Sequence, residues 1–119
     1  MNIEDFREYC LSLPESYEKM PFAGFFHNAH SLLVFYVRNK MFCFFDIDKF
    51  DMCTIKCNPT DIDELKAEYK AVGEPYNLSS RHWISIQFNS DMSDKEIKCL
   101  VKKSYHLIRK KTDLKGDKK

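Results

Sequence analysis

Three apolar segments of strand length lie close together between residues 31 and 57, and no other feature constrains the fold as strongly. The turn RNK at 38–40 and the loop DKFD at 48–51 separate them, and both are shorter than the dozen residues that a parallel crossover needs. The segments are therefore predicted to form an antiparallel meander. They are SLLVFYV at 31–37, MFCFFDI at 41–47 and MCTIKC at 52–57.

Helical patterns precede and follow this meander. Asn2 is predicted to cap a first helix that ends at Pro14, and Thr60 to cap a second helix. Ser93 and Glu96 form a capping box before a continuous apolar stripe that extends to residue 108. The chain is thus expected to contain three helices, the last being the most strongly patterned.

The segment SSRHWISIQF at 79–88 is predicted to be a further strand, with a short strand before it at 74–77. Side chains alternate across a strand, so Ile84 and Ile86 share one face while Trp83 points to the other. Residues 15–30 are predicted to form an irregular connection with room for a short edge strand.

These elements together predict an α+β fold. It is a two-layer sandwich in which an antiparallel sheet of about five strands carries helices on one face, in the order α-β(3)-α-β(2)-α. A chain of 119 residues is expected to form one domain, which we place at residues 1–111, followed by a basic flexible tail at 112–119.

Charge is distributed unevenly along the chain, although the net charge is only +1. Residues 1–90 carry nine basic and thirteen acidic side chains, whereas residues 91–119 carry ten basic and five acidic ones. The basic end could attract phosphates, or it could be an ordinary solvated helix. The acidic, amphipathic start of the sequence does not resemble a signal peptide, and no apolar run is long enough to cross a membrane, so a cytoplasmic location is expected.

The sheet face that carries Trp83 is the first candidate site. Alternation predicts that this face collects the aromatic side chains and two cations, a mixture that could stack bases and hold phosphates. Alternatively, Phe22, Phe25 and Phe26 could cover the face, or a second copy of the chain could pair with it. The residues predicted to share this face are Phe42, Phe44, Lys56, Arg81 and Trp83.

Signatures of metal binding and catalysis are weak or absent. His27 and His30 lie close together, but two imidazoles fall short of the three protein ligands that a zinc site needs. Cys53 and Cys57 point to the same side of a strand but stand about 13 Å apart, so they are expected to be core residues. Too few glycines are present for a phosphate-binding loop, and we expect neither catalysis nor a cofactor.

Several short motifs together resemble the MmcQ/YjbR family. They are PFAG at 21–24, KMFCFF at 40–45, IKCNP at 55–59, RHWISI at 81–86 and KKSYHLI at 102–108. The resemblance covers residues 3 to about 108, and it implies an α+β fold similar to frataxin (CyaY-like) and to type III secretion chaperones. The resemblance also implies DNA binding through a double-wing arrangement.

The sequence therefore favours a small DNA-binding protein, for which a regulatory role is one expectation. The alternative is a protein-interaction or chaperone-like module that uses the aromatic sheet face for a protein partner or a homodimer. In the first hypothesis the cations contact the phosphate backbone, while Trp83 and Arg81 form part of the binding face. The predicted nucleic-acid-binding residues are Arg38, Lys40, Lys56, Arg81, Trp83, Lys98, Lys102 and Arg109.

Overall fold

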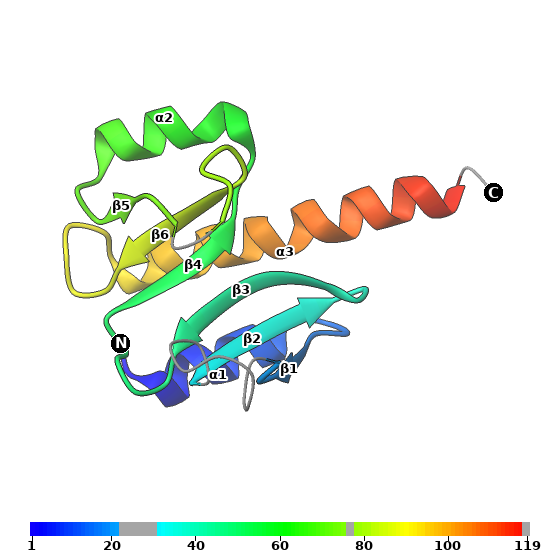
Figure 1. Ribbon diagram of the computed structural model, residues 1–119, viewed down its shortest axis with the longest axis horizontal. Helices are drawn as coiled ribbons and strands as arrows, with labels where there is room; N and C mark the ends of the chain where they lie inside the picture. Colours follow the sequence, from blue (N-terminus) through cyan, green and yellow to red (C-terminus); the bar gives the residue numbers. More distant parts are fainter. Residues whose placement is uncertain (22–30, 76–77, 118–119) are drawn as a thin grey trace.

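A six-stranded antiparallel sheet forms one layer of the molecule (Figure 1). The computed structural model describes residues 1–21, 31–75 and 78–117, with side chains described through residue 111. Along the sheet the strands follow the order β1-β2-β3-β4-β6-β5. Their bounds are Tyr17–Lys19 (β1), Leu32–Val37 (β2), Lys40–Asp46 (β3), Met52–Lys56 (β4), Val72–Gly73 (β5) and Trp83–Gln87 (β6).

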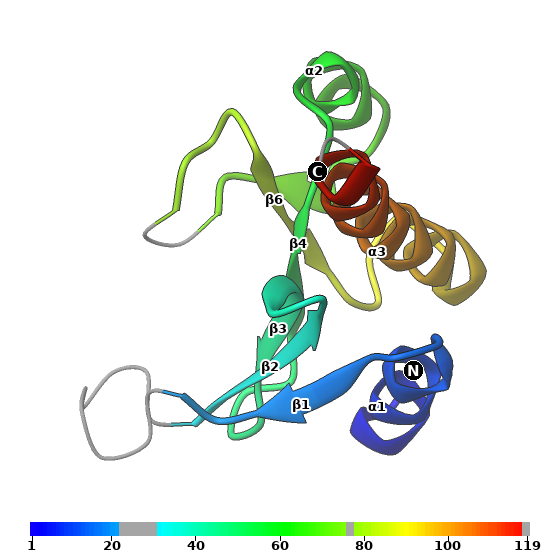
Figure 2. The ribbon, with the colours of Figure 1, turned by 90° about the vertical axis from the view of Figure 1, so that its right-hand side faces the viewer.

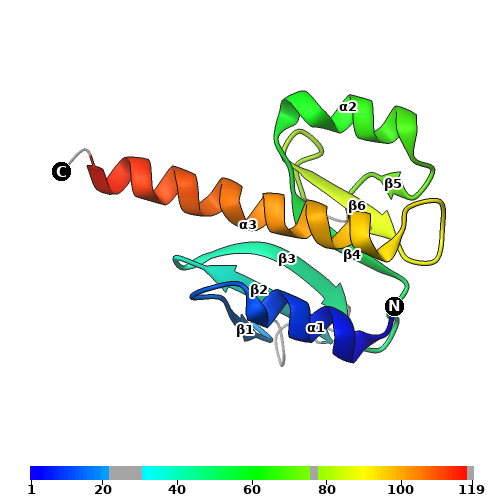
Figure 3. The ribbon, with the colours of Figure 1, turned by 180° about the vertical axis from the view of Figure 1, so that it is seen from behind.

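The helices form the second layer. Helices α1 (Ile3–Ser12) and α3 (Asp94–Asp117) lie on the same side of the sheet, which confirms the predicted two-layer architecture (Figure 2). The shorter helix α2 (Pro59–Glu68) lies across α3 from α1 (Figure 3). Helix α3 has 24 residues, about 36 Å of helix, and its C-terminal part projects past the sheet. It continues to Asp117 and so includes residues 112–117 of the segment 112–119 that was predicted to be a flexible tail.

Side-chain caps fix where the helices begin. The side-chain oxygen of Asn2 accepts a hydrogen bond from the backbone N–H of Asp5, and Ser93 caps Glu96 in the same way, as predicted. The prediction of Thr60 as the cap of α2 was wrong. Asn58 is the cap, because Pro59 occupies the first helical position, where its missing N–H leaves no bond unmade.

The main core lies between the sheet and the helices α1 and α3. Phe6 of α1 packs edge to face against Phe45 of β3, with ring centroids 5.6 Å apart. Ile84 and Ile86 of β6 are fully buried in this core, whereas Trp83 is not part of it. The strand alternation read from the sequence is therefore confirmed, and the indole lies on the face opposite the helices.

A β-bulge in β3 changes the face of one predicted residue. Phe35 pairs with Cys43 and Tyr36 with Met41, so Phe42 is an extra residue without a partner on β2. The prediction that Phe42 faces away from the helices was therefore wrong. Its side chain is fully buried against Tyr105 of α3, with ring centroids 5.6 Å apart.

Two short strands complete the sheet. The edge strand β1 lies within residues 15–30, where the sequence left room for such a strand, and it raises the sheet from about five strands to six. The short strand predicted at 74–77 is instead β5 at Val72–Gly73, which pairs with Ile86 and Ser85 of β6. Both β1 and β5 are edge strands of three residues or fewer, a length that limits unwanted pairing with other chains.

Candidate nucleic-acid interface

Three lysines from three separate elements interact electrostatically at one end of the molecule. Lys56 is the last residue of β4, Lys40 is the first residue of β3, and Lys111 lies on the projecting part of α3. We call these three residues the lysine site. Burial lowers the pKa of Lys56, and the positive charges of Lys111 and Lys40 lower it further. Within the described part of the chain, no carboxylate forms an ion pair with any of the three.

Lys56 is held in place by the tryptophan that the sequence singles out. Residues 56 and 83 are direct partners across strands β4 and β6. The ammonium nitrogen of Lys56 lies 5.1 Å from the centroid of the Trp83 ring, within the range of a cation–π contact. This contact fixes one cation of the lysine site on a rigid sheet rather than on a mobile loop.

Trp83 itself exposes little surface. Its residue is only 7% exposed, and the ring of Phe44 lies beside it with centroids 6.4 Å apart. On the same sheet face, Val34, Thr54 and Ser85 are also buried. A base could therefore reach only the rim of the indole without a rearrangement. The predicted cover by Phe22, Phe25 and Phe26 lies outside the described residues.

The β2–β3 turn places Arg38 close to Lys40 of the lysine site in the sequence. Arg38 and Asn39 both have positive φ values, 53° and 66°, as expected for a tight hairpin whose twist matches its strands. The guanidinium of Arg38 pairs with Glu15 at 3.2 Å, so its charge is partly neutralised. Among the two cations predicted for this turn, Lys40 is thus the one placed to contact an external phosphate.

The predicted cations of the last helix serve different purposes. The ammonium of Lys98 lies 5.6 Å from the ring centroid of Tyr9 and covers that part of α1. Arg109 donates a hydrogen bond to the Tyr105 hydroxyl at 3.0 Å, and that hydroxyl donates in turn to the carbonyl of Pro14. Lys102 is exposed. Lys98 and Arg109 thus contact the aromatic side chains of Tyr9 and Tyr105.

Arg81 was predicted to lie on the strand that contains Trp83, but it lies outside that strand. It lies in a turn before β6, where its backbone N–H bonds to the Ser79 hydroxyl at 3.3 Å. Its side chain is exposed. Because Arg81 lies outside β6, the alternation of side chains along that strand does not determine the face to which it points. Lys111 is the residue that sequence reasoning missed, since it becomes part of a site only because α3 continues past the sheet.

The other candidate chemistry receives no support from the described residues. Cys53 and Cys57 are buried, and burial together with Asp61 raises the pKa of Cys57 to about 11, which makes it a poor nucleophile and metal ligand near neutral pH. Within residues 1–21, 31–75 and 78–117, no group of three ligating side chains could hold a metal ion. His27 and His30 lie outside the described residues.

The fold and the lysine site define a small α+β sandwich domain with a candidate anion-binding end. The chain belongs to the YjbR family, whose sequence pattern matches residues 11–107, and the expected MmcQ/YjbR membership is thereby confirmed. No match was found among curated proteins. In the described part of the chain, no helix has both the length and the apolar character needed to cross a membrane.

Solved structures support the same fold. The crystal structure of the Deinococcus radiodurans protein DR2400, which has a DUF419 domain, is similar at 26% identity with a TM-score of 0.80. That match covers 93% of this chain and 80% of the other. A Pseudomonas syringae protein is similar at 22% identity with a TM-score of 0.72, covering 90% and 98% of the two chains. These likenesses concern the fold, and similarity to frataxin or secretion chaperones stays a prediction.

Proposed function

We propose that this protein binds DNA through the phosphate backbone and has a regulatory rather than a catalytic role in the cytoplasm. The observation that carries the proposal is the convergence of Lys40, Lys56 and Lys111 from three elements without a carboxylate partner among the described residues. Like charges held close together repel one another, and a bound phosphate relieves that repulsion.

The proposal concerns binding without base-specific recognition. Phosphate contacts position a protein on nucleic acid but carry no sequence information. The buried position of Trp83 favours a structural role for the indole. In this role the ring holds the ammonium group of Lys56 through a cation–π contact and does not stack on a base. Lys98, Lys102, Arg81 and the paired Arg38 are then expected to contribute long-range attraction more than direct contacts.

Charge reversal at two exposed members of the site tests this function. The double variant Lys40→Glu/Lys111→Glu is compared with Lys70→Glu/Lys95→Glu, which makes the same change in net charge at exposed positions elsewhere. Fluorescence anisotropy with labelled DNA duplex, single-stranded DNA and RNA measures affinity at low salt. We expect the site variant to weaken DNA binding by about tenfold or more relative to the control variant, because the lost contacts are local.

Three results would argue against this function. They are absence of binding to DNA at low salt, an equal loss of affinity in the two double variants, and clearly tighter binding to RNA. The alternative function, a protein-interaction module that uses the aromatic sheet face, predicts association that is insensitive to salt and depends on Trp83. Because the indole is buried, the aromatic sheet face offers a protein partner less accessible surface at Trp83 than the sequence suggested.

A further inference from the structure

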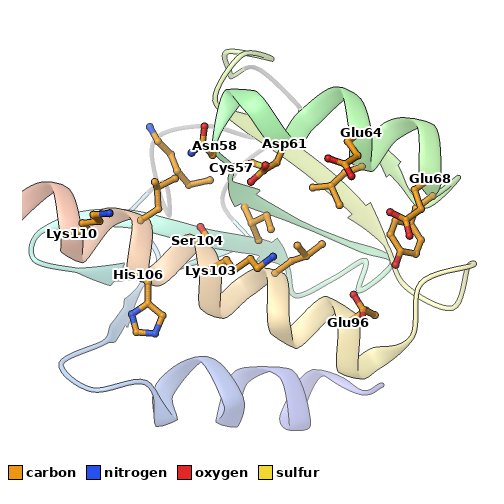
Figure 4. Close-up of a pocket in the computed structure, with 16 residues that line it drawn as sticks. Cys57, Asn58, Asp61, Glu64, Glu68, Glu96, Lys103, Ser104, His106 and Lys110 are labelled. Carbon is orange, nitrogen blue, oxygen red and sulfur yellow. The ribbon is translucent and has the colours of Figure 1, made fainter.

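A cleft of about 620 Å³ separates α2 from α3 beside the end of β4 (Figure 4). The two helices run in opposite directions along it. Asn58 and Lys110 lie toward one end, and Glu68 and Glu96 lie toward the other. From Asn58 to Glu68 the helix rises about 15 Å, a length that matches four or five residues of extended chain.

The wall formed by α2 is acidic. Asp61, Glu64 and Glu68 follow the helical spacing of three and four residues, so they share one face of α2. Figure 4 shows that these side chains hang from α2 toward the cleft. All three residues are exposed, and their carboxylates therefore remain hydrated and available to a ligand.

The opposite wall, formed by α3, is acidic at Glu96 and basic from Lys103 to Lys110. Lys103 and Lys110 of α3 line the cleft, while His106, between them, points away from α2 (Figure 4). Among the described residues, neither lysine forms an ion pair with a carboxylate of α2. From Lys103 to Lys110, walls of opposite charge thus face each other across a gap that their own side chains do not close.

The floor between the walls is apolar. Ile62 is the only buried residue of α2, and it does not line the cleft. Leu65 and Leu107 remain half-buried on either side. The apolar residues of the floor are Ile55, Leu65, Leu100 and Leu107.

We propose that this cleft binds a short extended peptide segment of a partner protein. The segment has apolar residues in its centre, a basic side chain beside Glu68 and Glu96, and an acidic side chain beside Lys110. Charge complementarity carries the assignment, because one end of the cleft is purely acidic and the other holds lysines. Lys56 of the lysine site also lines this cleft at its Asn58 end, whereas the carboxylates of α2 would repel a nucleic acid along the rest of it. The peptide proposal is therefore carried by the acidic face of α2 and does not depend on the DNA proposal.

A random heptapeptide library displayed on phage and selected on the purified protein tests the proposal. We expect enriched sequences with one basic and one acidic residue separated by apolar positions. The variant Glu64→Lys/Glu68→Lys should enrich peptides that are acidic at both ends, and Lys103→Glu/Lys110→Glu should enrich peptides that are basic at both ends. All substituted positions are exposed, so circular dichroism should show unchanged folds.

Direct binding then separates the cleft from the rest of the surface. A fluorescein-labelled copy of the best enriched peptide should bind Glu64→Lys/Glu68→Lys about tenfold more weakly than the wild type. The control Asp48→Lys/Asp63→Lys makes the same charge change at exposed residues outside the cleft and should bind as the wild type does. The proposal is overturned if no peptides are enriched, if they lack the charge pattern, or if the control variant loses as much affinity as Glu64→Lys/Glu68→Lys.

Discussion

The ammonium group of Lys56 lies 5.1 Å from the centre of the Trp83 indole, across the pairing of β4 with β6. This contact connects the two features that the sequence raised separately, the tryptophan on the non-helical face and the basic residues. The indole is buried, and it contacts the ammonium group of a lysine that lies on the adjacent strand.

Replacing Trp83 should lower the stability of the fold and should leave the self-association state of the protein unchanged. We expect Trp83→Ala to lower the free energy of unfolding by about 3 kcal/mol, because a large buried side chain is removed, while Trp83→Phe costs clearly less. Urea unfolding followed by circular dichroism measures the change. If Trp83→Ala keeps its stability but loses self-association in ultracentrifugation, the aromatic face is an interface and the structural role assigned to the indole is wrong.

The pKa of Lys56 reports the convergence of charge directly. Burial and the charges of Lys111 and Lys40 hold this pKa below the ordinary 10.5. Folding therefore makes the protonated form of Lys56 less favourable than it is in the unfolded chain. This cost to the free energy of unfolding is fully present below the lowered pKa, and it should disappear as the pH rises from that pKa toward 10.5. In Lys111→Gln the pKa should move upward, as measured by an NMR titration of the lysine side chain, and an unchanged value would place Lys111 too far away to matter.

The true cap of α2 can be distinguished from the predicted one. Asn58→Ala removes the acceptor for the backbone N–H of Thr60 and should cost about 1 kcal/mol of stability. Thr60→Ala removes only the hydroxyl that bonds to Asn58 and should cost a few tenths of a kcal/mol. Thermal unfolding compares the two variants. The reverse order of cost would restore Thr60 as the cap.

The bulge in β3 depends on a buried hydrogen bond from α3. The hydroxyl of Ser104 donates to the carbonyl oxygen of Phe42 at 2.7 Å. Ser104→Ala should lower the free energy of unfolding by about 1–2 kcal/mol, because a buried carbonyl loses its partner. Ser80→Ala, at an exposed position, serves as the control. Equal stability of the two variants would mean that the carbonyl of Phe42 finds another donor.

Much of the fold could be predicted because it depends on short-range patterns. Short connections specify antiparallel pairing, and the alternation through Trp83, Ile84 and Ile86 correctly assigned the two faces of β6. The position of Phe42 could not be predicted, because a bulge reflects how two strands pair and leaves no local sign in the sequence. The edge strands β1 and β5 are too short to show periodicity.

The candidate site was less predictable than the fold. Lys40 and Lys56 were identified from their place on strands and turns, and the structure brings them into one electrostatic cluster. Lys111 joins them only through the length of α3, and Arg109 is tied to Tyr105 instead of facing outward. Such relationships depend on distances between elements, which residue order does not encode. The cleft between α2 and α3 was missed for the same reason.

The salt dependence of DNA binding tests the central claim most directly. If each member of the lysine site neutralises one phosphate of duplex DNA, the plot of log K against log salt has a slope of about −2.7. Lys56→Met keeps the aliphatic stem over Trp83 and removes the charge, so the slope should fall to about −1.8 while the urea unfolding curve is unchanged or shifts to slightly higher stability. An unchanged slope in this folded variant would contradict the assignment of Lys56 to the DNA-binding site.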